Sequence, residues 1–246
     1  MDASDPRETL KAQFARVYGN AGEAPRVLGL LRAFWPLLLI CFLFGYLLRA
    51  LLPFPQLSLS AWGFLLILLS VSGVLLLAWG DKRLSNYLKG ARGEESVGRE
   101  LNFLSSEYAV FHGVHLPHGK ENFDHIVVAP TGVYVIETKN WSGRVRFEQG
   151  EVIADEISLH RSPVKQVKEE VAELHSYLTE RYTHGLPIQP VLCFLESELE
   201  EPIQNINGVV VCCAEQLMEV LSGALSEPIE EAERLAIEEL LQPLVS

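Results

Sequence analysis

Residues 123–139 read FDHIVVAPTGVYVIETK, and this stretch predicts a β-hairpin. β-Branched and aromatic residues fill both of its arms, as is typical of strands. Pro130 and Gly132 stand between the arms, and both residue types mark turns. The chain therefore contains a pair of neighbouring antiparallel strands, and the polar residues on the two arms are the first candidates for a functional site.

Three charged side chains gather on one face of this hairpin. Side chains alternate along a strand, so Glu137 and Lys139 share a face. A two-residue turn at 130–131 would place Asp124 opposite Glu137, whereas a turn at 131–132 would place it opposite Lys139. Any loop of even length brings the two carboxylates and the ammonium together, while an odd-length loop or a bulge would separate them.

This charge arrangement has two interpretations. Two neighbouring carboxylates repel each other unless a cation lies between them, and a hard divalent cation such as Mg²⁺ prefers oxygen ligands. A lysine beside such an ion can orient an attacking water or stabilise charge on a phosphate. The alternative is an exposed, charged strand face with ordinary cross-strand pairs. The hairpin alone leaves both interpretations open.

Two long apolar runs precede the hairpin, at residues 34–52 and 61–79. Each has about the length that spans a bilayer, and the short connector 53–60 has no charge. The runs predict a transmembrane helical hairpin, with a buried hairpin in a soluble protein as the alternative. Lys and Arg flank the runs on the outer sides and are absent from the connector, and only Arg49 argues the other way. Both termini are therefore expected in the cytoplasm.

The net charge of −12 is unevenly distributed along the chain. Residues 1–80 carry six Lys/Arg and four Asp/Glu, a balance of +2, whereas residues 81–246 carry a balance of −14. Phosphate contacts supply most nonspecific affinity for nucleic acid, so an acidic domain is a poor general binder of polyanions. Many of the acidic residues cluster at 196–201 and 227–239, away from the hairpin in sequence.

The hairpin is flanked by further regular elements. A helix is predicted at about 94–105, where Val97 and Leu101 form an apolar face from which Glu94 also projects, although Glu95 leaves that register open by one residue. The remaining pattern predicts strands at 108–114, 188–195 and 208–213, a strand or short hairpin at 144–153 after a turn at 140–143, and helices at 163–182, 214–221 and 228–241.

Four short motifs occur in this order along the chain: GARGE at 90–94, FDHIVV at 123–128, GVYVIETKNWSG at 132–143 and SPVKQ at 162–166. With the order helix, three strands, helix and strand, they resemble the PD-(D/E)XK nucleases and, within that group, the nuclease-related (NERD) domain. The resemblance covers about residues 90–200. It implies an α/β, restriction-endonuclease-like α-β-β-β-α-β core, with a mixed sheet flanked by helices.

The resemblance also implies a metal site for Mg²⁺ or Mn²⁺. Asp124 and Glu137 would be metal ligands, joined by the backbone carbonyl of Thr138. Glu94 would be the carboxylate on the helix that completes the site, directly or through water. No other cofactor is implied.

The remaining roles implied by the resemblance fall to two residues. Lys139 would position the attacking water or stabilise the pentavalent phosphorane, and Gln166 would contact the water or the scissile phosphate. His125 is expected to take no part, because strand alternation points it away from Asp124.

Taken together, the sequence predicts a cytoplasmic N-terminal segment (1–33), a transmembrane hairpin (34–80), a linker (81–92) and a nuclease-like domain (93–246). The predicted function is metal-dependent hydrolysis of DNA or RNA on the cytoplasmic side of a cell membrane. The alternative is an inactive nuclease-fold module tethered to the membrane for binding or sensing. The acidic C-terminal helices are candidates for binding a protein partner, and the oligomeric state is left open.

Overall fold

The computed structural model describes residues 14–51, 58–119, 122–154, 161–181, 186–223 and 229–245. The chain divides into two compact units, which are described separately. One is helical and comprises Ala24–Ala91. The other, an α/β unit, combines Met1–Glu23 with Arg92–Ser246.

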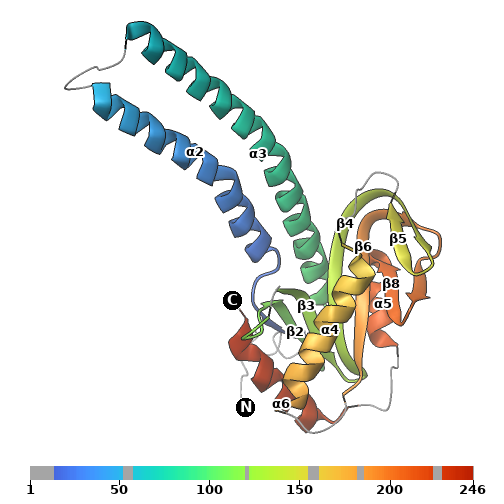
Figure 1. Ribbon diagram of the computed structural model, residues 1–246. Coiled ribbons are helices and arrows are strands. Elements are labelled where there is room, and N and C mark those ends of the chain that lie inside the picture. The colour runs from blue at the N-terminus through green and yellow to red at the C-terminus, as the bar shows by residue number, and fades with distance from the viewer. Residues whose placement is uncertain are drawn as a thin grey trace, which may run out of the picture. The chain divides into compact units, whose positions relative to one another are not determined.

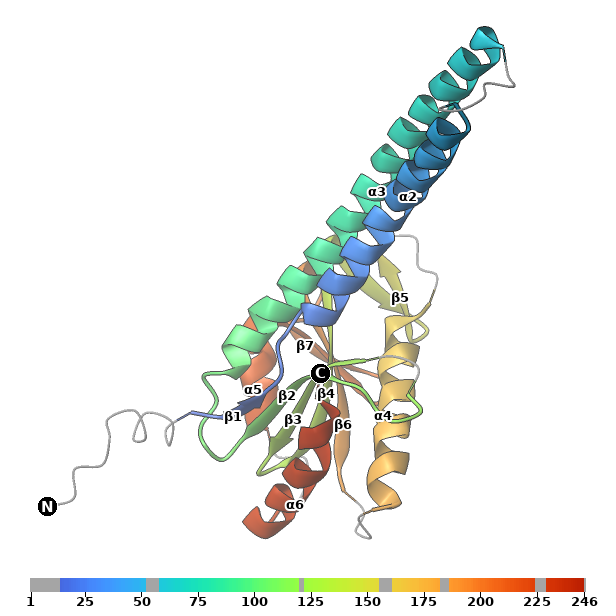
Figure 2. The same cartoon turned by 90° about the vertical axis from the view of Figure 1, so that its left-hand side faces the viewer.

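Both apolar runs form helices, α2 (Glu23–Leu51) and α3 (Leu59–Leu101), which lie side by side in Figures 1 and 2. The linker expected at 81–92 does not exist as a separate segment, because α3 continues through it. This stretch has no proline, and a glycine inside a helix costs only about 1 kcal/mol relative to alanine. The helix predicted at about 94–105 is thus the last part of α3 and ends at Leu101.

Large apolar side chains are exposed along α2 and α3. Leu38, Phe42, Phe64 and Ile67 are between 66% and 69% exposed. Even so, in the described part of the chain no helix is both long and apolar enough to cross a membrane. The structure therefore does not support the predicted transmembrane hairpin of residues 34–52 and 61–79. Much of the predicted connector, residues 53–57, lies outside the described residues.

The α/β unit is built on an eight-stranded mixed sheet in the described part of the chain (Figure 1). The strands follow the order β1-β2-β3-β4-β6-β8-β7, and β5 pairs with β4. Strand β3 runs antiparallel to β2 and β4, while β6 runs parallel to β4 and β8. The strands are β1 (Arg16–Tyr18), β2 (Ala109–Val114), β3 (Phe123–Ala129), β4 (Gly132–Glu148), β5 (Glu151–Ala154), β6 (Ile188–Leu199), β7 (Ile203–Ile206) and β8 (Val209–Cys213).

Helices cover both faces of this sheet, as Figure 2 shows for α4 and α5. One face packs against α4 (Pro163–Thr179) and α6 (Glu231–Leu241), which is followed by the 3₁₀ turn η2 (Gln242–Leu244). The other face packs against the end of α3 and α5 (Leu217–Ser222), which follows the 3₁₀ turn η1 (Ala214–Gln216). The predicted order of helix, three strands, helix and strand is confirmed.

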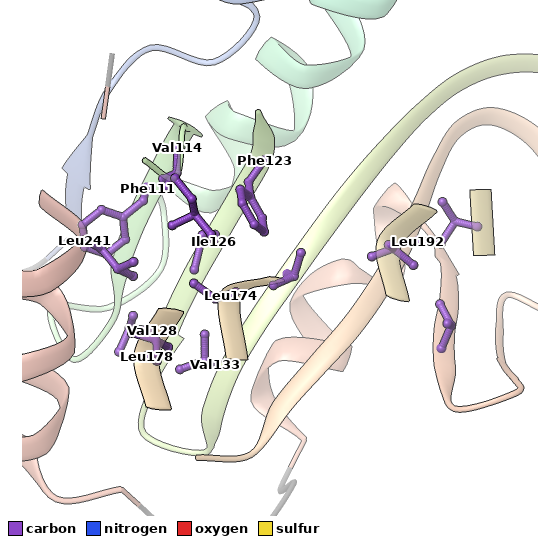
Figure 3. Packing of buried hydrophobic residues seen from close by; sticks show 14 of the residues in the cluster. Phe111, Val114, Phe123, Ile126, Val128, Val133, Leu174, Leu178, Leu192 and Leu241 are labelled. Atoms are coloured by element: carbon purple, nitrogen blue, oxygen red, sulfur yellow. The ribbon is translucent and has the colours of Figure 1, made fainter. Parts of the chain in front are cut away.

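Strand alternation divides the apolar side chains between two cores. Ile126 and Val128 of β3 point to the α4 face, where they join Leu174 and Leu178 (Figure 3). Val127, between them in sequence, belongs to the core on the opposite face. Because both faces of the central strands are buried, their register is fixed by packing as well as by hydrogen bonds.

One sequence expectation about the strands is wrong, and two short strands were not expected. The turn expected at 140–143 is absent, because β4 continues through it and shifts its register against β6 between Lys139 and Ser142. This shift is a β-bulge, which absorbs the extra residue without ending the strand. The short strands β1 and β7 were not predicted. The alternative of a short hairpin within 144–153 is confirmed by the pairing of β4 with β5.

The N-terminal strand β1 belongs to the α/β unit, although the sequence placed residues 1–33 in a segment of their own. It pairs in parallel with β2, and its Arg16 Nε lies 2.9 Å from both carboxylate oxygens of Glu238 in α6. The Tyr18 hydroxyl donates to the same carboxylate at 2.5 Å. Burial, and then this hydrogen bond, raise the pKa of Tyr18 to about 12. The strand is thus tied to the C-terminal helix.

Helix α3 approaches β4 closely at Gly93. A Cβ atom on this residue would lie 2.7 Å from the Cβ of Asn140, a separation that real Cβ atoms essentially never show. Gly90, one turn earlier in the same helix, has no atom within 4 Å of the equivalent position. The lack of a side chain at Gly93 therefore sets the distance between the helix and the strand next to Lys139.

We expect Gly93→Ala to lower the free energy of unfolding by about 1–3 kcal/mol, because the new methyl group overpacks the contact with Asn140. Gly90→Ala is the matched control and should raise stability by up to about 1 kcal/mol through helix propensity alone. Urea unfolding of the two variants measures the difference. Equal stabilisation by both substitutions would contradict the close approach.

Candidate active site

The hairpin turn has the even length that gathers the charged residues. Ala129 pairs with Gly132 and His125 with Ile136, so the turn has two central residues, at 130–131. The same register places Asp124 opposite Glu137 on the face that packs against α4. This is the first of the two arrangements that the sequence left open.

Strand β4 contributes the backbone as well as side chains to the site. The Thr138 N–H donates to Asp124 Oδ2 at 2.8 Å, which ties the carboxylate of β3 to its neighbour strand. This N–H is the contribution of Thr138 that the structure shows directly, whereas the resemblance assigned a role to its carbonyl. The hydrogen bond stabilises the ionised form of Asp124 and holds its side chain beside Glu137.

Three of the predicted residues form one hydrogen-bonded group. Lys139 Nζ pairs with Glu137 Oε1 and donates to Gln166 Oε1 at 3.3 Å. Gln166 Nε2 in turn donates to Glu137 Oε1 at 2.8 Å. Gln166 lies in the first turn of α4, which begins at Pro163, a residue type favoured at this position. The start of α4 therefore positions Gln166 over the end of the hairpin.

Glu94 joins the site from the other side, near the end of α3. The Gly93 contact brings this part of the helix next to β4, and the Gly22 N–H donates to the Glu94 carboxylate. Burial, and then the charge of Glu137, raise the pKa of Glu94 to about 7. A carboxyl group with this pKa is poised between its two protonation states at neutral pH.

The site carries more negative charge than its lysine neutralises. Burial, and then the Glu137 and Glu94 carboxylates, raise the pKa of Asp124 well above its usual value. Burial by itself would lower the pKa of Lys139, but the charges of Glu137, Asp124 and Glu170 outweigh it, and the pKa is raised. The lysine is therefore protonated at neutral pH. The carboxyl groups of Asp124 and Glu94 bind protons more readily than usual, because they are buried and lie close to other carboxylates.

Glu170 belongs to this group and was missed by the sequence analysis. It lies one turn after Gln166 in α4, is 4% exposed, and accepts a hydrogen bond from Gln166 Nε2 at 3.0 Å. The spacing of four residues from Gln166 could have identified it, because side chains so spaced are neighbours on a helix. Glu170 was missed because two consecutive glutamates in a helix usually lie on a solvent-exposed face. Glu169 is indeed exposed, whereas Glu170 is buried.

His125 points away from Asp124, as strand alternation predicted. It is fully buried on the opposite face of the sheet, where its Nδ1 lies 2.7 Å from Nδ1 of His112. Burial, and then the neighbouring histidine, lower the pKa of His125 well below its usual value. The two rings are therefore neutral. One Nδ1–H donates a hydrogen bond to the other Nδ1, and the pair lies apart from the carboxylate group.

The donor chemistry of the site fits a hard cation. Its ligands would be carboxylate oxygens, which Mg²⁺ and Mn²⁺ prefer. Glu137 is 3% exposed, and its buried Oε2 has no hydrogen-bond partner among the residues that the structure describes. In the part of the chain that the structure describes, no group of three or more His, Cys, Asp or Glu side chains is arranged to hold a metal ion. Here Lys139 is the cation that contacts Glu137.

Comparison with known proteins finds similarity in the segment that contains the site. An uncharacterized protein of Bacillus anthracis is 46% identical over 59 residues, which cover 22% of this chain and 28% of that protein. The chain thus spans less than a third of that relative. No solved structure matches. The family model described as nuclease-related domain, NERD, matches residues 89–195. This matched segment, which is less than half of the chain, contains all six predicted site residues.

Proposed function

We propose that the α/β unit is a metal-dependent nuclease that hydrolyses phosphodiester bonds of DNA or RNA. The observation that carries this proposal is the meeting of Asp124, Glu137, Lys139 and Gln166 on one face of the sheet, three of them in a single hydrogen-bonded group. The match of residues 89–195 to the nuclease-related domain supports the same class of chemistry.

In this proposal, the carboxylates of Asp124 and Glu137 hold Mg²⁺ or Mn²⁺, with Glu94 and the carbonyl of Thr138 completing the set. Two observations support it: Glu137 Oε2 has no hydrogen-bond partner in the described part of the chain, and the pKa values of Asp124 and Glu94 are raised. A divalent cation relieves the repulsion among these groups. A bound ion of this kind activates water and offsets charge on the phosphate.

The remaining residues act on the phosphate and on the attacking water. The raised pKa of Lys139 keeps its ammonium protonated, so it serves as a hydrogen-bond donor and a positive charge rather than as a base. Gln166 accepts from Lys139 and donates to Glu137, so it contacts both members of this ion pair. A phosphate would approach from the side of Lys139, where attraction partly offsets repulsion by the carboxylates.

A second candidate function is a nuclease-fold module that binds or senses a partner without cleavage. The observation that favours it is the pairing of exposed cations with acidic side chains on or beside β4, β6 and α4. Arg144 lies 3.9 Å from Glu198, while Arg161 and Lys165 lie 2.5 and 3.8 Å from Glu169. Such pairs reduce the positive field that draws nucleic acid. The acidic C-terminal helices would then contact a protein partner.

The cellular location is a separate proposal, which rests on the sequence. The apolar runs at 34–52 and 61–79 and the basic residues around them favour a membrane anchor with the nuclease-like domain in the cytoplasm. The exposed apolar side chains of α2 and α3 are compatible with it. The described helices do not provide support of their own.

The first prediction concerns cleavage. The purified full chain should cut labelled DNA or RNA in the presence of Mg²⁺ or Mn²⁺. Lys139→Ala should lower the rate by about 10²–10³-fold, because an electrostatic donor to the reacting group is lost. Lys165→Ala, on the exposed side of α4, is the matched control and should stay within about twofold. Absence of cleavage by the folded wild type, despite metal binding, would favour the binding module instead.

The second prediction concerns pH. Glu94 has a pKa of about 7, so below neutral pH it holds a proton that a cation must displace. Calorimetric affinity for Mn²⁺ should therefore rise between pH 6 and pH 8, by up to about tenfold per unit for each proton released. Glu94→Gln should bind more weakly and with a shallower dependence. Identical pH dependence in both proteins would remove Glu94 from the metal site.

The third prediction concerns location. If the apolar runs anchor the chain, the full-length protein should stay in the membrane fraction after extraction with alkaline carbonate. Deletion of residues 34–79 should release it. Recovery of the intact chain in the soluble fraction would contradict the anchor without affecting the proposed chemistry.

A further inference from the structure

Glu170 is a buried carboxylate among exposed charges of the same helix. It is 4% exposed, whereas the side chain of Glu169, next to it in sequence, is 51% exposed and pairs with Arg161 and Lys165. Burying a carboxylate is costly unless hydrogen bonds or charges compensate it. Glu170 accepts a hydrogen bond from Gln166 and contributes to the raised pKa of Lys139, so part of its compensation comes from the candidate site.

Both N–H groups and the oxygen of the Gln166 side-chain amide form hydrogen bonds. The amide nitrogen has two N–H groups, and it donates to Glu137 Oε1 at 2.8 Å and to Glu170 Oε1 at 3.0 Å. The amide oxygen accepts from Lys139 Nζ at 3.3 Å. A reversed amide would place its oxygen against two carboxylates and its N–H groups against an ammonium. The neighbouring charges thus allow a single orientation.

We propose that Glu170 is a positioning residue of the candidate site, which fixes the Gln166 amide between Glu137 and Lys139. The proposal rests on the proposed function, because Glu170 acts through Gln166 and not on the substrate. Glu170 matters because Glu137 has two roles. That carboxylate is both the second acceptor of the Gln166 amide and a proposed metal ligand, so Glu170 gives the amide an anchor outside the metal ligands.

Without Glu170, one N–H of Gln166 would lose its acceptor, and the orientation of the amide would depend on Glu137 and Lys139 alone. A glutamine side chain has three rotatable bonds, so loss of one fixed contact releases it to other rotamers. Lys139 would then lose its fixed hydrogen-bond acceptor on α4, the Gln166 amide oxygen. The reacting groups are thus expected to be less well ordered, although none of them has been replaced.

The spectroscopic test compares four single variants of the full chain and uses a fifth, Gln166→Ala, for assignment. Glu170→Met keeps the unbranched shape but offers no acceptor, Glu170→Ala is a second variant of this kind, and Glu170→Gln restores an acceptor oxygen without charge. Glu169→Ala is the matched control. The Gln166 side-chain amide resonances, assigned from their loss in Gln166→Ala, should move in the Met and Ala variants. They should return toward wild type in Glu170→Gln and stay unchanged in Glu169→Ala.

The kinetic test is a double-mutant cycle on kcat/KM for cleavage with Mn²⁺. Glu170→Met should lower kcat/KM by about tenfold or more in the wild-type background, and by less than about twofold in the Gln166→Ala background. Glu170→Gln should recover most of the loss. A role in stability alone would lower the melting temperature without this dependence on Gln166.

The two tests separate the proposals. If the Gln166 resonances respond as expected but the wild type cleaves nothing, the positioning contact stands and the nuclease function falls. If the wild type cleaves but Glu170→Met and Glu170→Ala leave the Gln166 resonances in place, the positioning role is overturned. An equal effect of Glu170→Met with and without Gln166 overturns it as well.

Discussion

The site depends on one constraint, the two-residue turn at 130–131 that sets Asp124 opposite Glu137. A slip of one residue would move every side chain of one arm to the other face of the sheet. Burial of both faces opposes such a slip, because Ile126 and Val127 already occupy separate cores. Two carboxylates are thus held together by the packing of their apolar neighbours, against their own repulsion.

This repulsion organises the groups around the hairpin. Glu94 and Asp124 have raised pKa values. The pKa of Lys139 is raised as well, because the neighbouring carboxylates stabilise its ammonium. Gln166 connects the Glu137 carboxylate with the Lys139 ammonium through a neutral amide, which adds hydrogen bonds without adding charge. The result is a hydrogen-bonded acidic centre inside a unit whose overall composition is also acidic. Nuclease chemistry in such a unit would require the metal for binding as well as for catalysis.

Much of this arrangement was predictable from local patterns. The hairpin, α4 and the shared face of Glu137 and Lys139 follow from strand alternation and helical spacing. The choice between two turn positions did not, because it depends on packing across the sheet. The bulge after Lys139, the three-residue strand β1 and the buried state of Glu170 also depend on partners distant in sequence. The continuous α3 was missed because the glycines near its end suggested a flexible boundary that the helix tolerates.

The tie between β1 and α6 has a consequence for biosynthesis. Arg16 and Glu238 are 222 positions apart, so the first strand acquires its ionic partner only after all other strands of the sheet have been made. Loop closure over such a distance is entropically costly, and folds dominated by distant contacts form slowly. The tie between β1 and α6 is thus expected to form late, after the central hairpin.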